Sequence, residues 1–538
     1  MSPLAASFYL TTPIFYVNDV PHIGHAYTTV LADVLARYHR LFGADVFLLT
    51  GTDEHGQKVE TAARERGLST RAHVDRMAAV WAESFAGLGL AYDRFIRTTE
   101  PEHVEVVREL LRRIHAAGDV YVAPYLGWYC VPDERYWTEK DLVDGRCPTC
   151  GRTVERLEEQ NYFFRMGRYQ DWLVGHLHAN PEFIVPETRR NEVLGFLAQP
   201  LNDLCISRPR ARVAWGVPLP FDEDYVAYVW VDALINYVTG AGFLTDPPGF
   251  ERRWPADLHL IGKDILTTHS VYWPTLLRSA GLPPPRRIAA HGWWLRDGQK
   301  MSKSLGNVVS PEALVATVGL DAARWYLVRE MSLGQDGNFT FEGLVTRLNA
   351  ELANDLGNLL SRVVNMVGRY AGGLVPPPEP ERLAGSADLR ELAQATPGRA
   401  AAAVQRLAVP QALEEVLALV RATNRYLEAV APWQLAKREP AASGGVRESL
   451  GHAAEALRVA FVLLQPVVPS LARRGLEALG ARGEELGGPA ADASLAAAAW
   501  GAVPCGRARL SAPLFPRLEE ESLHAAAPAP APSGGPRG

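Results

Sequence analysis

Residues 8–50 read FYLTTPIFYVNDVPHIGHAYTTVLADVLARYHRLFGADVFLLT, and this stretch indicates the fold class of the chain. Residues 8–12 form an apolar, strand-like run that ends at Pro13. Residues 23–42 carry apolar side chains at helical spacing as far as a glycine, and residues 45–50 form a second short apolar run. Strand, helix and strand in this order are the opening unit of a parallel, nucleotide-binding sheet.

A second set of the same kind occurs much later in the chain. Residues 258–261 are predicted to form a strand, residues 268–280 a helix and residues 287–290 another strand. Residues 116–228, which precede this set, differ in character because they hold cysteines, many aromatic residues and several turns. We therefore expect two halves of one parallel-sheet domain, separated by an insertion.

From about residue 341 onward the pattern is helical, apart from a proline-rich linker at residues 375–381. Residues 349–367 and 411–430 are long amphipathic stretches of the kind that build a helix bundle. Residues 525–538 are rich in alanine, proline and glycine and cannot bury a core, so we expect a disordered tail.

The composition limits the class of protein. With 538 residues, the chain is expected to form three or more domains, and 47% hydrophobic with 22% charged residues is typical of a soluble globular protein. No apolar run reaches the roughly 20 residues that cross a bilayer, and residues 1–7 lack the pattern of a secretory signal. We expect a cytoplasmic protein without a membrane partner. The net charge of −6 argues mildly against a generic nucleic-acid binder, but RNA binding depends on where the basic residues lie.

Lysine is rare in this chain. Only six of its 55 lysine and arginine residues are lysines, and two of them lie together in the pentapeptide KMSKS at residues 300–304. Lysine is a compact charge on a flexible stem whereas arginine is a rigid planar fork, so lysine is expected where arginine cannot replace it. Far earlier, the tetrapeptide HIGH at residues 22–25 stands at the start of the first predicted helix. Each motif alone is weak evidence, but the two in this order are strong evidence for one function.

This pair of motifs resembles the two-part signature of class I aminoacyl-tRNA synthetases. Further segments make the chain similar to the methionyl-tRNA synthetase family over nearly its full length, to about residue 517. The matching segments are TTPIFYVNDVPHIGH (11–25), TGTDEHGQK (50–58), YVWVDALINY (228–237), HLIGKDILTTHSVYW (259–273), HGWWLRDGQKMSKSLGN (291–307) and PWQLAK (432–437).

The resemblance implies an α/β fold: a Rossmann-like parallel-sheet catalytic domain split by a connective insertion, followed by an all-α anticodon-binding helix bundle. The implied division is a first catalytic half (1–115), the insertion with its cysteine module (116–228), a second catalytic half with the KMSKS loop (229–325), a stem-contact region with the first bundle helix (326–375), the anticodon-binding bundle (376–517) and a disordered tail (518–538).

The resemblance also implies the reaction. The enzyme would activate L-methionine with ATP and Mg²⁺ to methionyl-adenylate, then transfer it to the 3′ end of initiator and elongator tRNA(Met). Negative charge moves towards the leaving pyrophosphate, so catalysis requires positioning and pre-placed positive charge, which a helix start and flexible lysines can supply. The catalytic residues would be His22, His25, Lys300 and Lys303. ATP would also contact Gly24, Gly262, Asp264, His291, Met301 and Ser302.

The same resemblance implies a methionine pocket with many aromatic side chains. A thioether is apolar and polarisable, and it gains from contact with aromatic edges. Asp53 would receive the ammonium group of the substrate. The pocket would be lined by Ile14, Tyr16, Trp230, Ala233, Leu234, Tyr237, Ile265, His269 and Trp273, of which we expect one or two to lie behind the first layer. Two mild departures from the family pattern are Pro13 and Leu234.

Three of the five cysteines form a module in the insertion. Cys130 is followed three residues later by Asp133, and Cys147 by Cys150, so two pairs with metal-ligand spacing stand thirteen residues apart. This pattern predicts structural, tetrahedral Zn²⁺, although the family usually has cysteine or histidine where Asp133 stands. The alternative is three buried thiols and a surface aspartate at a turn.

In the helical half, Asn358 and Arg362 lie four residues apart on one helical face, and Trp433 begins a later helix. By resemblance these three residues would meet the unpaired anticodon bases, which proteins read by stacking and by hydrogen bonds to base edges. Arg421 and Arg425 are weaker candidates for phosphate contact. No tRNA-binding barrel follows the bundle in this sequence, so we expect a monomer.

Two other functions remain open at this point. A catalytically inactive tRNA-binding paralogue would usually have lost a signature histidine or lysine, and this chain keeps all four. A synthetase for another apolar amino acid is the second alternative. Leucine, isoleucine and valine enzymes carry a large editing domain in the insertion, for which about 110 residues leave little room. The zinc ligands of cysteinyl-tRNA synthetase have no evident match here.

Overall fold

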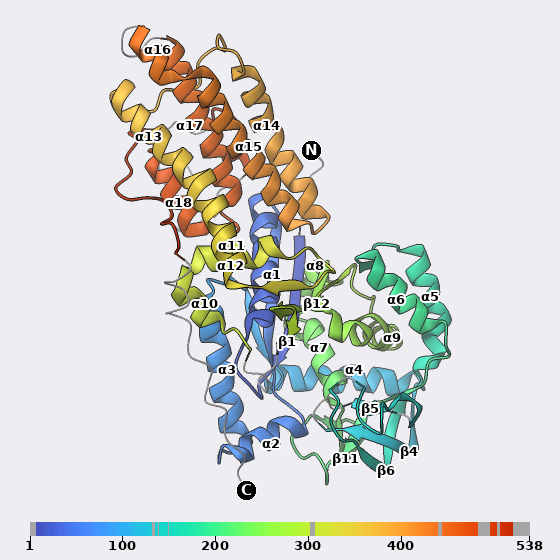
Figure 1. The fold of residues 1–538 in the computed structure, drawn as a ribbon. Helices are drawn as coiled ribbons and strands as arrows, with labels where there is room; N and C mark the ends of the chain where they lie inside the picture. Colours follow the sequence, from blue (N-terminus) through green and yellow to red (C-terminus); the bar gives the residue numbers. More distant parts are fainter. Residues whose placement is uncertain are drawn as a thin grey trace.

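The structure is a computed structural model (Figure 1). It describes residues 7–131, 135–137, 139–148, 150–301, 307–438, 444–481, 495–502 and 506–519. An α/β part holds the parallel sheet, a smaller antiparallel part projects from it, and a bundle of long helices extends from the opposite end (Figure 1). No helix in these ranges is long and apolar enough to cross a membrane.

The centre of the α/β part is a six-stranded sheet in which every neighbouring pair is parallel. In spatial order its strands are β3 (Arg94–Arg97), β2 (Asp45–Asp53), β1 (Ser7–Tyr16), β12 (Leu258–Gly262), β13 (Ile288–His291) and β7 (Ile184–Val185). The two halves predicted from the sequence therefore meet at β1 and β12, where Leu10 lies opposite Leu258. The strand order reverses between β1 and β12, because successive strands of each half are added outward from this junction. In open parallel sheets, ligands bind beyond the carboxyl ends of the strands at such a reversal.

Helices cover both faces of this sheet. They are α1 (Ile23–Leu41), α2 (Gln57–Glu65), α3 (Thr70–Gly87), α4 (Pro101–Ala116), α7 (Val229–Ala241), α8 (Pro247–Arg253), α9 (Trp273–Ser279), α10 (Pro311–Val318) and α11 (Leu320–Glu330). Consecutive strand residues point to opposite faces. Accordingly Leu48 and Leu260 join the core under α1 and α11, whereas Leu49 and Ile261 join the core under α4, α7 and α9. The predicted α/β fold is confirmed.

The first strand is longer than the sequence indicated. We expected it to end at residue 12, but β1 continues to Tyr16. Its register against β2 shifts between Thr11 and Ile14, so the ladder is interrupted around Pro13 and then resumes. Proline has no N–H to donate, and an interruption lets a strand continue past it. The residues after the proline thereby reach the carboxyl edge of the sheet.

In the described part of residues 116–228, the expected insertion, the chain builds two small antiparallel sheets and two α-helices. One antiparallel sheet has the order β5 (Arg135–Trp137), β4 (Val120–Cys130), β6 (Glu155–Phe164) and β8 (Leu204–Cys205). The other elements are α5 (Gln170–Ala179), α6 (Glu187–Leu197), β9 (Ser207–Pro209), β10 (Pro218–Leu219) and β11 (Asp222–Ala227). One strand from this part of the chain, β7, is the outer strand of the main sheet, where Ile184 pairs with Ile288.

A third small sheet lies at the carboxyl edge and carries the start of the KMSKS segment. Its strands are β15 (Gln299–Lys300), β14 (Trp294–Arg296) and β16 (Gly337–Phe339), with β14 in the middle. Lys300 pairs with Leu295, and Trp294 pairs with Gly337. The sheet therefore fixes the backbone on both sides of the turn between β14 and β15.

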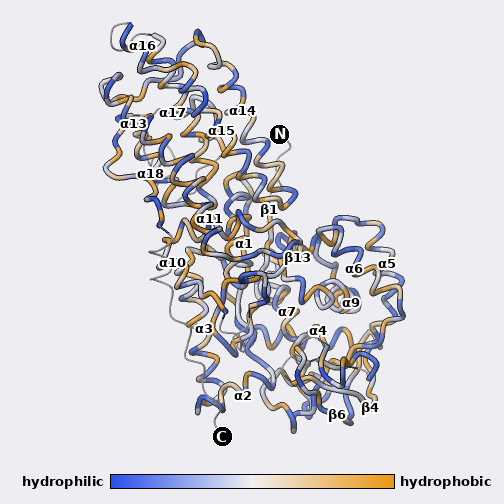
Figure 2. The backbone as a smooth tube through the Cα atoms, viewed as in Figure 1, coloured by the Kyte–Doolittle hydropathy of each residue, from blue (hydrophilic) through white to orange (hydrophobic). Residues whose placement is uncertain are grey.

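The helix bundle begins with α12 (Phe341–Leu348) and a π-helical segment (Asn349–Asn358). It continues with α13 (Leu359–Tyr370), α14 (Ser386–Gln405), α15 (Val409–Val430), α16 (Pro432–Arg438), α17 (Gly444–Leu464) and α18 (Pro469–Ala478). Hydrophobic and hydrophilic residues alternate along these helices (Figure 2). The amphipathic stretches at 349–367 and 411–430 are confirmed as bundle helices.

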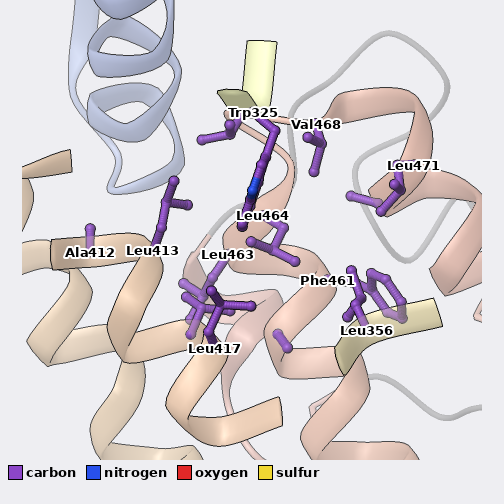
Figure 3. Close-up of a cluster of buried hydrophobic side chains, with 14 of the residues drawn as sticks. Trp325, Leu356, Ala412, Leu413, Leu417, Phe461, Leu463, Leu464, Val468 and Leu471 are labelled. Atoms are coloured by element: carbon purple, nitrogen blue, oxygen red, sulfur yellow. The ribbon is translucent and has the colours of Figure 1, made fainter. Parts of the chain in front are cut away.

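The bundle and the α/β part share one core. Figure 3 shows Trp325 of α11 beside Leu413 of α15 and Leu464 of α17. Deeper still, the fully buried side chain of Arg324 forms an ion pair with Asp33 of α1, with 2.6 Å between Nη2 and Oδ2. Its guanidinium also donates to the carbonyl oxygens of Leu88, Pro466 and Val467, so it joins α1, the end of α3 and the α17–α18 turn.

Candidate active site

A cavity of about 380 Å³ opens at the carboxyl ends of β1, β2, β12 and β13. It brings together residues that the sequence places far apart. From the predicted catalytic set it includes His22, His25 and Lys300. From the predicted nucleotide set it includes Gly24, Gly262, Asp264, His291 and Met301. From the predicted methionine set it includes Ile14, Tyr16, Asp53, Trp230, Ala233, Leu234, Tyr237, Ile265 and His269. Lys303 and Ser302 lie outside the described residues.

The start of α1 is built from the HIGH tetrapeptide itself. His22 is the N-cap residue, and its Nδ1 accepts a hydrogen bond from the Gly24 backbone N–H at 3.0 Å. The backbone N–H of His22 donates in turn to Nδ1 of His25 at 3.2 Å, and the two rings stack with centroids 3.7 Å apart. This reciprocal arrangement is a capping box made of two imidazoles.

The capping box fixes the tautomer of both histidines. Because each Nδ1 accepts a backbone N–H, a neutral imidazole here carries its proton on Nε2. His22 and His25 can therefore each offer an Nε2–H donor at a helix N-terminus, where anions are favoured. Gly24 is required for this geometry, since a Cβ at this position would lie 2.8 Å from Cε1 of His22.

His291 closes the nucleotide side of the cavity. Its Nδ1–H donates to the Gly292 carbonyl at 2.7 Å, so its Nε2 accepts from the Thr28 hydroxyl, also at 2.7 Å. Burial lowers the pKa of His291, and the imidazole is neutral at physiological pH. Thr28 lies one turn after Gly24 on α1, so this bond ties the end of β13 to the helix that starts with the HIGH tetrapeptide.

On the opposite side, Tyr237 and His269 form a buried polar pair among apolar side chains. The Tyr237 hydroxyl donates to Nε2 of His269 at 2.8 Å, and Nδ1–H of His269 donates to the Ile265 carbonyl at 2.9 Å. Burial lowers the pKa of His269 to about 4, so the ring is neutral and held in one tautomer. With Trp230 and Ile14 in the same wall, this half of the cavity suits an apolar side chain.

One residue of the predicted methionine set lies behind the cavity wall. Trp273 is fully buried and donates its indole N–H to Nε2 of His259 at 3.2 Å. Its ring centroid is 6.1 Å from that of Tyr237, so it supports the tyrosine and does not line the cavity. The sequence could not separate these two layers because both contain buried aromatic side chains.

A buried cluster holds the other face of α7 in place. Asp232 accepts from Nδ1 of His55 at 2.7 Å and from Nε2 of His103 at 2.9 Å. Burial alone would raise the pKa of Asp232. The electrostatic attraction of the two histidines and the hydrogen bonds that they donate lower it instead, to about 2. Sequence reasoning missed this cluster, although Asp232 is adjacent to the predicted residue Ala233 and a buried carboxylate requires partners.

Six further residues of the cavity wall were not among the site residues predicted from the sequence. They are Pro13, Phe15, Thr28, Gly292, Trp293 and Trp294. Helical spacing could have identified Thr28, because it is four residues after Gly24 and therefore on the same face of α1. The other five lie inside segments that matched the family, but those matches did not show which residues face the cavity.

The cysteine module brings three thiols together. The Sγ atoms of Cys130, Cys147 and Cys150 all lie within 4.8 Å of one another, and those of Cys130 and Cys150 are 3.5 Å apart. Three thiols at this spacing fit a tetrahedral soft-metal site with one further ligand. The predicted fourth ligand, Asp133, lies outside the described residues.

At the far end of the bundle, two of the three predicted anticodon residues are in contact. The guanidinium carbon of Arg362 on α13 lies 4.8 Å from the ring centroid of Trp433 on α16 (Figure 1 shows both helices). Asn358 is exposed one turn before Arg362. Arg421, a weaker candidate, is engaged in ion pairs with Asp355 at 2.8 Å and with a second bundle carboxylate.

Comparisons with known proteins agree with this geometry. A family described as tRNA synthetases class I (M) matches residues 8–157 and 150–364, and the anticodon binding domain of methionyl tRNA ligase matches residues 384–526. A methionine–tRNA ligase of Caldanaerobacter subterraneus is 45% identical over 475 residues, which cover 88% of this chain and 74% of the relative. The corresponding ligase of Mycobacterium bovis is 47% identical and is covered to 92%.

Among solved structures, Mycobacterium tuberculosis methionyl-tRNA synthetase in complex with methionyl-adenylate superposes with a TM-score of 0.90 at 44% sequence identity. The match covers 95% of this chain and 100% of that chain. Sequence, domain order and fold thus agree over almost the whole molecule, and the chain belongs to the methionyl-tRNA synthetase family of class I aminoacyl-tRNA synthetases.

Proposed function

We propose that the cavity at the carboxyl ends of β1 and β12 carries out the adenylation step of a methionine–tRNA ligase. Membership of the family assigns the overall reaction, which joins methionine to tRNA at the expense of ATP. One observation supports the assignment of residues. A helix start with two imidazoles, Lys300 of the KMSKS segment and an apolar aromatic wall all line the same cavity.

In the proposed first step, a carboxylate oxygen of methionine attacks the α-phosphorus of ATP. The bond between that phosphorus and the bridging oxygen breaks, and pyrophosphate leaves with the bonding electrons. The Nε2–H groups of His22 and His25 would donate to phosphate oxygens, and the ammonium groups of Lys300 and Lys303 would balance the charge on the leaving group. Mg²⁺ bound to ATP would supply further charge neutralisation.

Recognition of methionine would divide between one charge and many apolar contacts. The Asp53 carboxylate, at the end of β2, would receive the ammonium group, while the thioether would lie against Trp230 and Tyr237. The hydrogen bond from Tyr237 to His269 fixes the wall in one arrangement, because rotating either ring would leave a buried polar atom without its partner.

In the proposed second step, the 2′-hydroxyl of the terminal adenosine of tRNA(Met) attacks the carbonyl carbon of the adenylate. The hydroxyl proton is lost, methionine becomes esterified to the tRNA, and AMP leaves. Asn358, Arg362 and Trp433 would bind the anticodon of initiator and elongator tRNA at the far end of the bundle. We also propose that the enzyme acts as a cytoplasmic monomer, and three closely spaced thiols suit a reducing compartment.

The cysteine module is proposed to hold a structural Zn²⁺, which would cross-link the hairpin of the insertion. Cys130, Cys147 and Cys150 would be three of the ligands, with Asp133 as the predicted fourth. Metal analysis of the purified protein should find about one zinc per chain. Cys147→Ser should lower that content and the thermal stability while leaving the adenylation rate nearly unchanged. A metal-free protein of full stability would contradict the proposal.

Amino-acid-dependent exchange between ATP and pyrophosphate tests the proposed site directly. Exchange should require methionine and should not occur with leucine or cysteine. Exchange with another amino acid in place of methionine would favour a different specificity, and no exchange at all would favour the inactive paralogue. His25→Asn should reduce exchange on the order of 100-fold. His115→Asn, on the exposed face of α4, is the matched control and should not reduce it.

A further inference from the structure

The rim of the cavity contains a tryptophan that contacts two of the six lysines of the chain. Trp293 follows β13 and lines the same cavity as the HIGH tetrapeptide. The Nζ atom of Lys263 and the Nζ atom of Lys300 each lie over its indole ring, both at 4.2 Å from the ring centroid. A cation over an indole face is attracted by the negative potential of that face.

The two lysines differ in what else holds them. Nζ of Lys263 donates to both oxygens of Asp336, at 2.6 and 2.8 Å, so its charge is already balanced. Lys300 is exposed, and within the described ranges no carboxylate lies within 4.0 Å of its Nζ. Among the contacts that the structure gives the Lys300 ammonium, the indole of Trp293 is therefore the one that fixes its place.

The position of the indole is itself fixed from several directions. The backbone N–H of Trp293 donates to Asp336 at 2.8 Å, and its indole N–H lies 3.3 Å from Oδ1 of Asp264. Asp264 and Lys300 both line the cavity. The ring thus forms a fixed shelf on the nucleotide side of the cavity, and the flexible lysine rests on it.

We propose that Trp293 is a positioning residue for adenylation, whose indole face holds the Lys300 ammonium beside the nucleotide site before ATP arrives. The inference rests on the proposed role of Lys300 at the phosphates. A lysine side chain loses considerable rotamer entropy when it is ordered. Because the indole already orders the Lys300 side chain in part, less rotamer entropy remains to be lost when the transition state forms. Trp293 should therefore raise the rate of adenylation more than the affinity for methionine.

The first experiment compares Trp293→Leu, which removes the π face, with Trp293→Phe, which keeps a smaller one. ATP–pyrophosphate exchange should show kcat lowered about three- to fivefold in Trp293→Leu and largely restored in Trp293→Phe, with the KM for methionine unchanged. Trp172→Leu is the matched control. It removes a half-buried indole that has Arg278 over its ring at 5.4 Å and does not line the cavity, so it should leave kcat unchanged.

A double-mutant cycle with Lys300→Gln separates positioning from a structural role. If Trp293 acts through Lys300, Trp293→Leu should have no further effect on single-turnover adenylation in the Lys300→Gln background. An equal loss in both backgrounds, or no loss in either, would overturn the inference. Full activity of Lys300→Gln alone would instead overturn the proposed role of Lys300, and the two failures are distinguishable because Lys300→Gln is measured by itself.

Discussion

Lys303 illustrates at the residue scale why the kind of cation matters at a crowded phosphate. Lys303→Arg keeps the charge but replaces a compact ammonium by a wider planar group on a different stem. We expect exchange between ATP and pyrophosphate to fall on the order of 100-fold, while methionine binding measured by calorimetry persists. Lys140→Arg, at an exposed position of the insertion, is the control and should be fully active. Near-full activity of Lys303→Arg would contradict the argument from lysine scarcity.

The histidines of the cavity illustrate a second point at this scale. His22 and His25 were predicted from their motif, but their tautomers follow only from the backbone N–H groups that each Nδ1 accepts. His269 was predicted as one of many wall residues, yet its hydrogen bonds to Tyr237 and Ile265 give it a defined orientation. Sequence patterns identify residue types, whereas the direction of each donor depends on neighbours that the fold supplies.

At the scale of elements, α13 and α16 bring two of the three predicted anticodon residues, Arg362 and Trp433, into contact. Trp433→Ala should leave methionine-dependent exchange normal, because the residue is at the far end of the bundle from the cavity. Charging of tRNA should fall about 5- to 150-fold, since stacking of one base on an aromatic ring contributes about 1–3 kcal/mol. Aminoacylation at varied tRNA concentration measures this loss. Trp500→Ala, also near the bundle, is the control. Equal losses of exchange and charging in Trp433→Ala would mean that Trp433 has a structural role.

Element boundaries show where sequence reasoning succeeded and where it did not. The first helix was expected at 23–42 and is observed at Ile23–Leu41, because one apolar face and a terminal glycine define it locally. By contrast, β7 lies within the residues assigned to the insertion but pairs with β13. Two residues carry no periodic signal, so their membership of the main sheet depends on a long-range contact that local patterns cannot reveal.

At the scale of the whole molecule, Arg324 joins the α/β part to the helix bundle. Arg324→Met would leave Asp33 buried with one cationic partner fewer, and we expect the free energy of unfolding to fall by about 3–5 kcal/mol. Urea unfolding followed by circular dichroism measures the change. Arg37→Met removes the other, partly exposed partner of Asp33 and should cost clearly less. Equal losses for the two variants would argue against a special role of the buried pair.

The pH dependence of stability should follow the buried neutral histidines. Burial lowers the pKa of His39 to about 4, and that of His269 also to about 4, from an ordinary value near 6.5. Well above pH 6.5 the two histidines are neutral in both the folded and the unfolded chain, so they do not lower the stability. As the pH falls from 6.5 towards 4, the unfolded chain binds protons that the folded chain does not. Each of the two histidines therefore lowers the free energy of unfolding by about 1.4 kcal/mol per pH unit.

Chemical unfolding at several pH values between 4 and 8 tests this expectation. His39→Phe is the informative variant, because the His39 ring stacks on Phe8 with centroids 3.6 Å apart and phenylalanine keeps that contact without titrating. The variant should show a shallower loss of stability towards pH 4 than the parent protein. An identical slope would mean that His39 does not contribute to the pH dependence.

The sequence by itself determined the class of the molecule and the order of its parts, because strand and helix periods are local. Most of the residues that line the cavity were predicted from the resemblance of its motifs to the family, which keeps particular residue types at particular spacings. Only the tertiary structure decided that Trp273 lies behind the wall and that Asp232 bridges two histidines. It alone placed Trp293 under two lysines. These relations join residues from separate elements, and their geometry exists only after the elements have packed.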